Sequence, residues 1–174
     1  MTEGLRQLLV LRHAKSAWPV GVADAERPLS SRGERAADTI GRFLAVNELL
    51  PDHVACSPAR RTRQTADAVL RAAGAPSDVA VSIEAQLYDG DVFQVVRELP
   101  DEARRALVVG HEPELVELVR TLCGADVRLP TGALAVIELE APWPLQPAGR
   151  GVLRALVTPK LLGTGSWTTV PAGT

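Results

Sequence analysis

The segment LLVLRHAKSAWP, residues 8–19, is the part of the chain that decides the fold class. Its first four residues, Leu8 to Leu11, form a short apolar run that is typical of a buried strand. The run ends at Arg12 and His13, and a polar loop follows. Short apolar runs of the same kind recur at 54–56, 79–83 and 106–109, and each precedes a polar stretch.

Segments with helical periodicity separate these predicted strands. Apolar residues recur on one helical face from Ala36 to Leu44, and Ser31 and Glu34 have the spacing of a capping box for that helix. Further helices are expected at 59–73, around 92–99 and from Pro113 onward, and the segments 134–139 and 152–158 look like closing strands. Alternating strands and helices predict an α/β domain of three layers, with a central, mostly parallel sheet flanked by helices.

Composition and charge narrow the function classes. The 174 residues fit a single domain, 1–174, and the 46% hydrophobic and 23% charged content is that of an ordinary globular protein. A net charge of −2 and 3% aromatic residues give no support for a nucleic-acid or membrane surface. Two cysteines, Cys56 and Cys123, make no disulfide framework, and the short apolar run near the N-terminus is no signal peptide. We therefore expect a cytoplasmic protein.

Polar clusters follow three of the predicted strands: Arg12 and His13, the stretch 57–65, and His111. The carboxyl ends of parallel strands lie at one edge of a sheet, so one pocket could hold two histidines and several arginines. A neutral imidazole is a competent nucleophile, and guanidinium groups bind phosphoryl oxygens in pairs. The combination indicates phosphoryl transfer.

Other chemistries fit the sequence less well. A cysteine phosphatase requires C-x5-R, but the position that Cys56 would need for arginine holds Thr62. Among the three histidines there is no H-x-H or H-E-x-x-H spacing, and nothing resembles a Walker A motif or G-x-G-x-x-G, so we expect neither metal nor cofactor. Asp24, Glu26 and Arg27 are read as solvated loop residues, in a loop that could overhang the pocket.

Taken together, these motifs resemble the histidine phosphatase superfamily, in the form seen in its SixA-type phosphohistidine phosphatase branch. Five stretches match it in family order: LRHAKSAWP, RPLSSRGERAA, CSPARRTRQTA, VVGHEPEL and TGALAVIEL. The resemblance runs from Leu8 to about Leu139 and implies a phosphoglycerate-mutase-like fold. Only modest helices and a strand are expected between the third and fourth stretches, so we expect no large cap insertion over the site.

The resemblance also implies roles for particular residues. His13 would be the phosphorylated nucleophile, and Arg12 its phosphate-binding neighbour. The family arginine lies four residues after a serine, so counting from Ser57 it is Arg61. His111 would be the second pocket histidine, which binds the phosphoryl group.

Neighbouring positions are less constrained by the resemblance. Arg60 fills a position that the family does not require. Ser16 and Trp18 sit where the related mutases have R-H-G-x-S-x-W, so Ser16 is expected to border the pocket and to contribute to substrate binding. Ala14 replaces the glycine of the motif, as in many members of the branch.

The resemblance implies a metal-independent phosphatase that removes phosphoryl groups from protein histidines through phospho-His13. A phosphatase of a small phosphate monoester and a non-catalytic phosphoprotein-binding domain are the alternatives. Many superfamily members supply a carboxylate as general acid, and the candidates here are Glu84, the first choice, and Asp89. A surface position for Glu84 at the end of a strand is equally compatible with the sequence.

Overall fold

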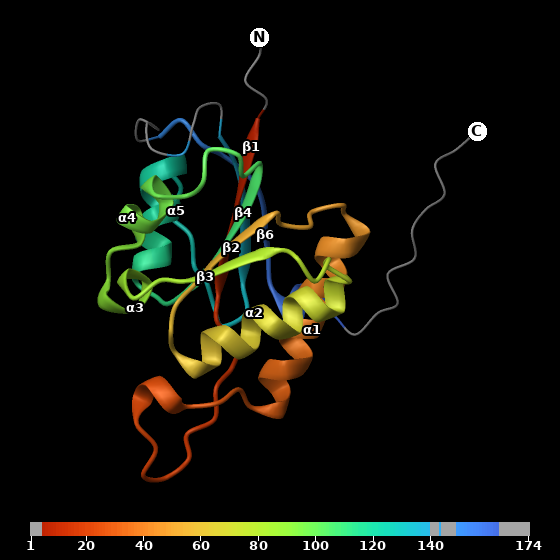
Figure 1. The fold of residues 1–174 in the computed structure, drawn as a ribbon, viewed down its shortest axis with the longest axis vertical. Helices are drawn as coiled ribbons and strands as arrows, with labels where there is room; N and C mark the ends of the chain where they lie inside the picture. The colour runs from red at the N-terminus through yellow and green to blue at the C-terminus, as the bar shows by residue number, and fades with distance from the viewer. Residues whose placement is uncertain (1–4, 140–142, 144–148, 164–174) are drawn as a thin grey trace, which may run out of the picture.

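The computed structural model describes residues 5–139, 143 and 149–163. They form an α/β domain in which a six-stranded sheet lies between two helical layers (Figure 1). The strands are β1 (Arg6–Arg12), β2 (His53–Cys56), β3 (Ala80–Ile83), β4 (Arg105–Gly110), β5 (Leu134–Leu139) and β6 (Val152–Val157). The helices are η1 (Asp24–Glu26), α1 (Ser31–Val46), α2 (Arg60–Ala73), α3 (Gln86–Asp89), α4 (Val92–Arg97), α5 (Glu114–Cys123) and α6 (Pro159–Leu162).

The sheet confirms the predicted fold class. Its strand order is β3-β2-β4-β1-β5-β6. The pairs β3–β2, β2–β4 and β4–β1 are parallel, whereas β5 runs antiparallel to both β1 and β6. Five of the six strands therefore run in one direction. Only α3 and α4 separate β3 from β4, so no large cap is inserted there.

Strand β1 explains why the opening segment reads as a continuous apolar run. Successive side chains of a strand point to opposite faces, and helices cover both faces of this sheet. Leu8 and Val10 accordingly pack with α4 and α5, whereas Leu9 and Leu11 pack with α1 and α2. All four are fully buried. The central position of β1 fixes where Arg12 and His13 emerge from the sheet.

The start of α1 is joined to the loop that follows β1. The predicted capping box at Ser31 is wrong by one residue, because the cap is Ser30, whose Oγ accepts the Gly33 N–H at 3.1 Å. Ser30 also donates its backbone N–H and its hydroxyl to the carbonyl of Lys15, each at 2.9 Å. A Cβ at residue 33 would collide with that carbonyl, so Gly33 permits the close approach.

Among the described residues, no helix has the length and apolar character that crossing a bilayer requires.

Candidate active site

His13 lies at the junction of β1 and β4. Its backbone N–H donates to the carbonyl of Gly110 at 3.1 Å, which ties the two strand ends together. Its Nδ1 lies 2.8 Å from the carbonyl oxygen of Ala14. A carbonyl can only accept, so this hydrogen bond requires the proton on Nδ1. The geometry therefore leaves Nε2 of His13 with a free lone pair.

A side chain from α2 fixes the His13 loop. The N–H of Ala14 donates to Oγ1 of Thr65 at 3.0 Å, and that hydroxyl donates to the carbonyl of Arg61 at 2.7 Å. Ala14 and Thr65 are both fully buried. These hydrogen bonds join the loop that carries His13 to the first turns of α2.

His111 lies beside His13, with 5.3 Å between the ring centroids. Its Nδ1 is 3.4 Å from Nη2 of Arg61, and its Nε2 is 2.8 Å from Oγ of Ser57. Because a guanidinium can only donate, Nδ1 of His111 is the acceptor and the proton lies on Nε2, facing Ser57. The ring edge of Tyr88 packs against His111, at 5.6 Å between centroids.

Arg61 points into this site, whereas its neighbour Arg60 does not. The Arg61 side chain is buried, and besides its contact with His111 it binds Asp24 twice. Nη1 donates to the Asp24 carbonyl oxygen at 2.7 Å, and Nη2 donates to Oδ2 at 3.0 Å. Arg60 is exposed and lies on another side of α2.

The side chain of Arg12 is held by Leu129 and Glu112. Its Nη1 donates to the carbonyl oxygen of Leu129 at 2.8 Å and forms an ion pair with Glu112. Its Nε is buried and has no hydrogen-bond partner among the described residues. The structure therefore brings together Arg12, His13, Arg61 and His111, which come from the ends of β1 and β4 and from the first turn of α2.

The loop before α1 is a correction to the sequence analysis. Asp24 and Arg27 are not simply solvated, because Asp24 bridges Arg27 and Arg61. The hydroxyl of Tyr88 also donates to Asp24 Oδ2, at 3.0 Å. The spacing of Asp24 and Arg27 by three residues was a signal for their ion pair, but only the fold shows that Asp24 reaches Arg61.

Arg27 itself is buried. Its Nη2 donates to Oγ of Ser16 at 2.6 Å, its Nε donates to the carbonyl of Ala17 at 3.1 Å, and its guanidinium stacks on the ring of Trp18 at 3.2 Å. Ser16 is therefore engaged with Arg27, and among the described residues no hydrogen bond links it to either pocket histidine. The sequence does not predict a contact for Ser57, whose hydroxyl lies 2.8 Å from Nε2 of His111 and helps to hold that ring.

The environment of the two histidines keeps both rings neutral. Burial lowers the pKa of His13 to about 4, against the opposing effect of its hydrogen bond to Ala14, and the charges of Arg61, Arg12 and Arg27 lower it further. Burial also lowers the pKa of His111 to about 4, with His13 and Arg61 adding to the effect. Both rings are therefore uncharged at neutral pH.

Asp24 carries the opposite charge at the same site. Partial burial acts to raise its pKa, but hydrogen bonds from Arg27, Tyr88 and Arg61 outweigh that effect and lower the pKa to about 2. The same hydrogen bond to Asp24 raises the pKa of Tyr88. Asp24 is thus a carboxylate that accepts a hydrogen bond from Arg61 within the site.

The two proposed general acids lie away from these contacts. Glu84 follows β3, and its backbone N–H donates to the Cys56 carbonyl at 2.8 Å. Asp89 is exposed at the end of α3. Among the described residues, neither carboxylate forms a hydrogen bond or an ion pair with the pocket histidines or arginines. The role of Glu84 stays a prediction.

No three His, Cys, Asp or Glu side chains within the described ranges are grouped as metal ligands. The positive charge of the site comes from its arginines.

The fold and this site define an α/β protein of the phosphoglycerate-mutase-like class, with two histidines and two arginines at the carboxyl edge of its sheet. Residues 8–92 match the sequence profile of the histidine phosphatase superfamily (branch 1). An uncharacterized protein of Mycobacterium tuberculosis is 35% identical over 147 residues, which cover 76% of this chain and 89% of the relative. The chain belongs to the histidine phosphatase superfamily.

Solved structures agree with this placement. A protein assigned as the phosphohistidine phosphatase SixA of Nakamurella multipartitia is 31% identical, with a TM-score of 0.76 over 91% of this chain and 99% of that one. The protein histidine phosphatase SixA in complex with tungstate is 24% identical, with a TM-score of 0.76 over 90% and 99% of the two chains. At 24% identity, the similarity to the tungstate complex establishes only that the two proteins share a fold.

Proposed function

We propose that this protein is a phosphohistidine phosphatase that removes phosphoryl groups from protein histidines through a covalent phospho-His13 intermediate. The observation that carries the proposal is the geometry of His13, whose Nδ1 is hydrogen-bonded to the Ala14 carbonyl so that Nε2 keeps its lone pair, in a ring that lies beside His111 and is close enough to Arg61 and Arg12 for their charges to lower its pKa. The similarity to proteins assigned as SixA supports the choice of substrate class.

The chemistry has two displacements. The lone pair on His13 Nε2 attacks phosphorus, and the bond from phosphorus to the substrate imidazole nitrogen breaks as that imidazole leaves with its electron pair and takes up a proton. Water then attacks phospho-His13, which yields inorganic phosphate and neutral His13. Arg12 and Arg61 would stabilise the charge on the three equatorial oxygens in both steps.

Substrate binding must rearrange the contacts of Arg61. In this structure its donors are directed at Asp24 and His111. A phosphoryl dianion would compete with the Asp24 carboxylate for the same guanidinium. It would also raise the pKa of His111, because an adjacent negative charge favours the protonated ring. A protonated His111 could then donate to a phosphoryl oxygen.

Metal independence is part of the proposal, since the arginines and His111 supply the positive charge that a metal would otherwise bring. Vanadate should inhibit by taking up the five-coordinate geometry of the transition state, and the binding of tungstate by a SixA protein is in line with an oxyanion site on this fold. Chelation by EDTA should leave the rate unchanged.

A protein substrate is favoured over a small ester by the absence of a large cap between β3 and β4. Phosphohistidine also releases imidazole, a far better leaving group than an alkoxide, so a dedicated general acid matters less. Because Cys56 and Cys123 are both free, we also infer a reducing, cytoplasmic setting. A small-ester phosphatase on the same fold is the alternative.

The test compares kcat/KM for a phosphohistidine protein and for an alkyl phosphate, with and without EDTA. Mass spectrometry without acid, after brief exposure to substrate, should find phosphate on His13. We expect the phosphoprotein to be preferred. A strong preference for the alkyl ester would replace the proposal with the small-ester phosphatase, and binding without turnover of either substrate would leave a phosphoprotein-binding domain.

A further inference from the structure

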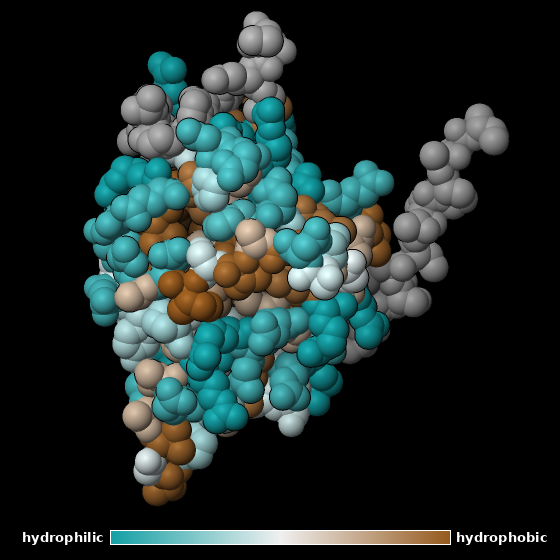
Figure 2. Space-filling model, in the orientation of Figure 1, coloured by the Kyte–Doolittle hydropathy of each residue, from teal (hydrophilic) through white to brown (hydrophobic). Residues whose placement is uncertain are grey.

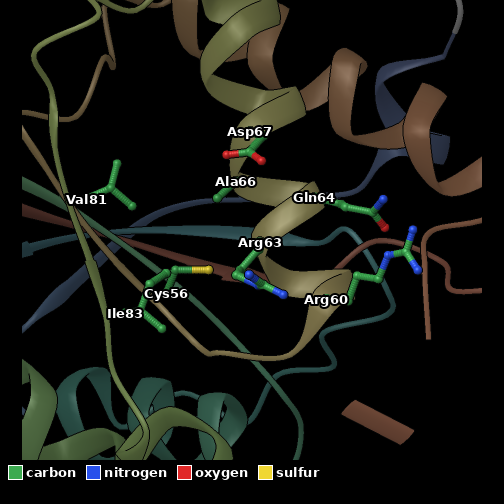
Figure 3. Close-up of a pocket in the computed structure, with 8 residues that line it drawn as sticks. All are labelled: Cys56, Arg60, Arg63, Gln64, Ala66, Asp67, Val81 and Ile83. Carbon is green, nitrogen blue, oxygen red and sulfur yellow. The ribbon is translucent and has the colours of Figure 1, made fainter. Parts of the chain in front are cut away.

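A second surface lies on the other side of α2 from the catalytic pocket. It is a hollow of about 260 Å³ between the first turns of α2 and strand β3. Figure 3 shows Arg60 and Arg63 on its α2 side, and Val81 and Ile83 on its β3 side. Cys56 lies at its floor, where burial raises the pKa of the thiol to about 12 and keeps it uncharged and unreactive.

The β3 side of the hollow is an exposed apolar edge. Val81 and Ile83 are 50% and 51% exposed. Figure 2 shows apolar surface gathered over β3, with hydrophilic surface around it. Exposed β-branched residues on an edge strand are a liability in a protein that leaves them uncovered. This patch is therefore suited to contact with another chain.

The backbone of β3 is open on the same edge. Strand β3 ends the sheet, with β2 as its only neighbour among the described residues. The N–H of Glu84 points to the Cys56 carbonyl on β2. Backbone groups alternate in direction along a strand, so the N–H and C=O of Val81 and Ile83 point away from β2. None of these four groups has a hydrogen-bond partner within the described residues.

On its α2 side, the hollow is basic at the end that lies nearer the catalytic pocket. Arg60 and Arg63 are exposed, and the side chain of neither forms an ion pair or a hydrogen bond with the described residues. Asp67 lines the hollow one turn further along the helix. Arg61 lies between the two arginines in sequence and points into the catalytic pocket. The hollow therefore adjoins the site, with its two arginines on the same end of α2 as Arg61.

We propose that β3 and the first turn of α2 form the docking site for an extended, acidic segment of the phosphoprotein substrate, which adds to the free edge of the sheet as a further strand. Its backbone would pair with Val81 and Ile83, and its apolar side chains would enter the hollow. Its carboxylates would bind Arg60 and Arg63, away from Asp67. The substrate assignment rests on the proposed function, whereas the docking of an acidic strand does not.

A second copy of this chain suits the surface less well. The β3 strand of a second copy, Ala80–Ile83, has no acidic residue and would leave the charges of Arg60 and Arg63 uncompensated. An acidic segment instead neutralises them.

The experiment uses the whole protein and a fluorescent, acetylated peptide that carries no phosphate, with valine at positions 1 and 3, glutamate at positions 5 and 7 and threonine between them, so that one face of the strand carries both residue types. Fluorescence anisotropy should show binding that weakens with salt. Arg60→Glu and Arg63→Glu should each weaken it by about tenfold or more. Arg71→Glu is the matched control, because residue 71 lies on the same helix, three turns further along, and should leave binding unchanged.

A backbone variant separates strand addition from simple charge attraction. Val81→Pro removes an N–H that points away from β2, and proline is tolerated at such a position on an edge strand, while Val81→Ala controls for the loss of the valine side chain. Val81→Pro should abolish peptide binding while leaving the unfolding temperature and the hydrolysis of p-nitrophenyl phosphate close to those of the wild type. The three charge variants should also retain that hydrolysis. Equal binding by wild type and Val81→Pro would overturn strand addition.

The remaining outcomes also decide the matter. A phosphoprotein that carries an acidic segment should lose about tenfold in kcat/KM with Arg63→Glu, mostly through KM. If the protein hydrolyses phosphohistidine but does not bind the peptide, the docking site is ruled out and the proposed function is not. If the protein binds the peptide but hydrolyses only alkyl esters, the proposed function is ruled out and the docking site is not. Dimers in sedimentation that Val81→Pro dissociates would assign the edge to a second copy.

Discussion

The pocket around His13 and the hollow beside β3 both involve the first turn of α2, but their arginines differ in burial and in ion pairing. Arg61 is buried and bound to Asp24 and His111, whereas Arg60 and Arg63 are exposed and make no ion pair within the described residues. The difference follows from helix geometry, since consecutive residues lie about 100° apart around the axis. One helical turn can therefore serve chemistry on one side and recognition on the other.

The largest expected effect comes from removing His13, the proposed nucleophile. His13→Ala should lower kcat by about 10⁴-fold or more on any substrate, because the proposed mechanism places the covalent intermediate on this residue. It should leave peptide binding at the β3 hollow unchanged. Steady-state kinetics, with circular dichroism as the control for folding, measure this. Activity near that of the wild type would remove His13 from the mechanism.

The two adjacent arginines should differ sharply on a small ester such as p-nitrophenyl phosphate. Arg61→Ala removes charge-assisted donors from the pocket and should cost about 3 kcal/mol, or roughly 10²- to 10³-fold in kcat/KM. Arg60→Ala should cost less than about threefold, since its side chain is exposed on the other side of the helix. A larger loss of kcat/KM in Arg60→Ala than in Arg61→Ala would mean that Arg60, and not Arg61, serves the pocket.

Acid should lower the free energy of unfolding, because the two pocket histidines resist protonation in the folded protein. An unfolded histidine takes up a proton near pH 6.5, but His13 and His111 do so only near pH 4 in the folded protein. Between these values the unfolded state binds more protons, so the free energy of unfolding falls as the pH falls from 6.5 to 4. The slope should be at most about 1.4 kcal/mol per pH unit for each ring, and less because the rings are partly exposed.

Urea unfolding at several pH values checks this behaviour. The variant His13→Gln should show a clearly shallower decrease between pH 6.5 and 4, because one of the two shifted groups is gone. The charge variants at the β3 hollow should keep the wild-type slope. An equal slope in His13→Gln and wild type would show that burial does not shift the pKa of His13.

A substitution at Asp24 tests whether its carboxylate competes with the substrate phosphate for Arg61. Asp24→Asn removes the negative charge that competes with phosphate for Arg61 but keeps an oxygen that can accept. KM for p-nitrophenyl phosphate and Ki for vanadate should fall by about three- to tenfold, with a smaller change in kcat. A 100-fold loss of kcat would instead place Asp24 in the chemistry, as a proton donor.

The smallest effect is expected at Glu84. Glu84→Gln should change kcat/KM on a phosphohistidine protein by less than tenfold, under about 1.4 kcal/mol, because imidazole leaves without strong acid assistance. The alkyl phosphate serves as the comparison substrate. Loss of alkyl phosphatase activity, in an enzyme that prefers that ester, would favour the small-ester phosphatase and give Glu84 the role of general acid.

Much of this architecture could be predicted from the sequence because it depends on local patterns. The apolar run before Arg12 predicts a central strand, and polar residues at the ends of parallel strands must meet at one edge. The alternation of strands and helices predicts the class of fold. The resemblance to the family, counted from Ser57, predicts that Arg61 points into the pocket, and helical spacing places Arg60 about 100° away around the axis.

Only the tertiary structure decided how distant loops meet. Asp24 reaches Arg61 across 37 residues, and Tyr88 reaches Asp24 across 64. No local periodicity encodes such contacts, because they depend on how the loop before α1 packs over α2. The capping position also moved from Ser31 to Ser30 because the chain there must bind the Lys15 carbonyl. Local chemistry thus determined which groups could react, whereas long-range packing determined their charge, their tautomers and the partners that hold them.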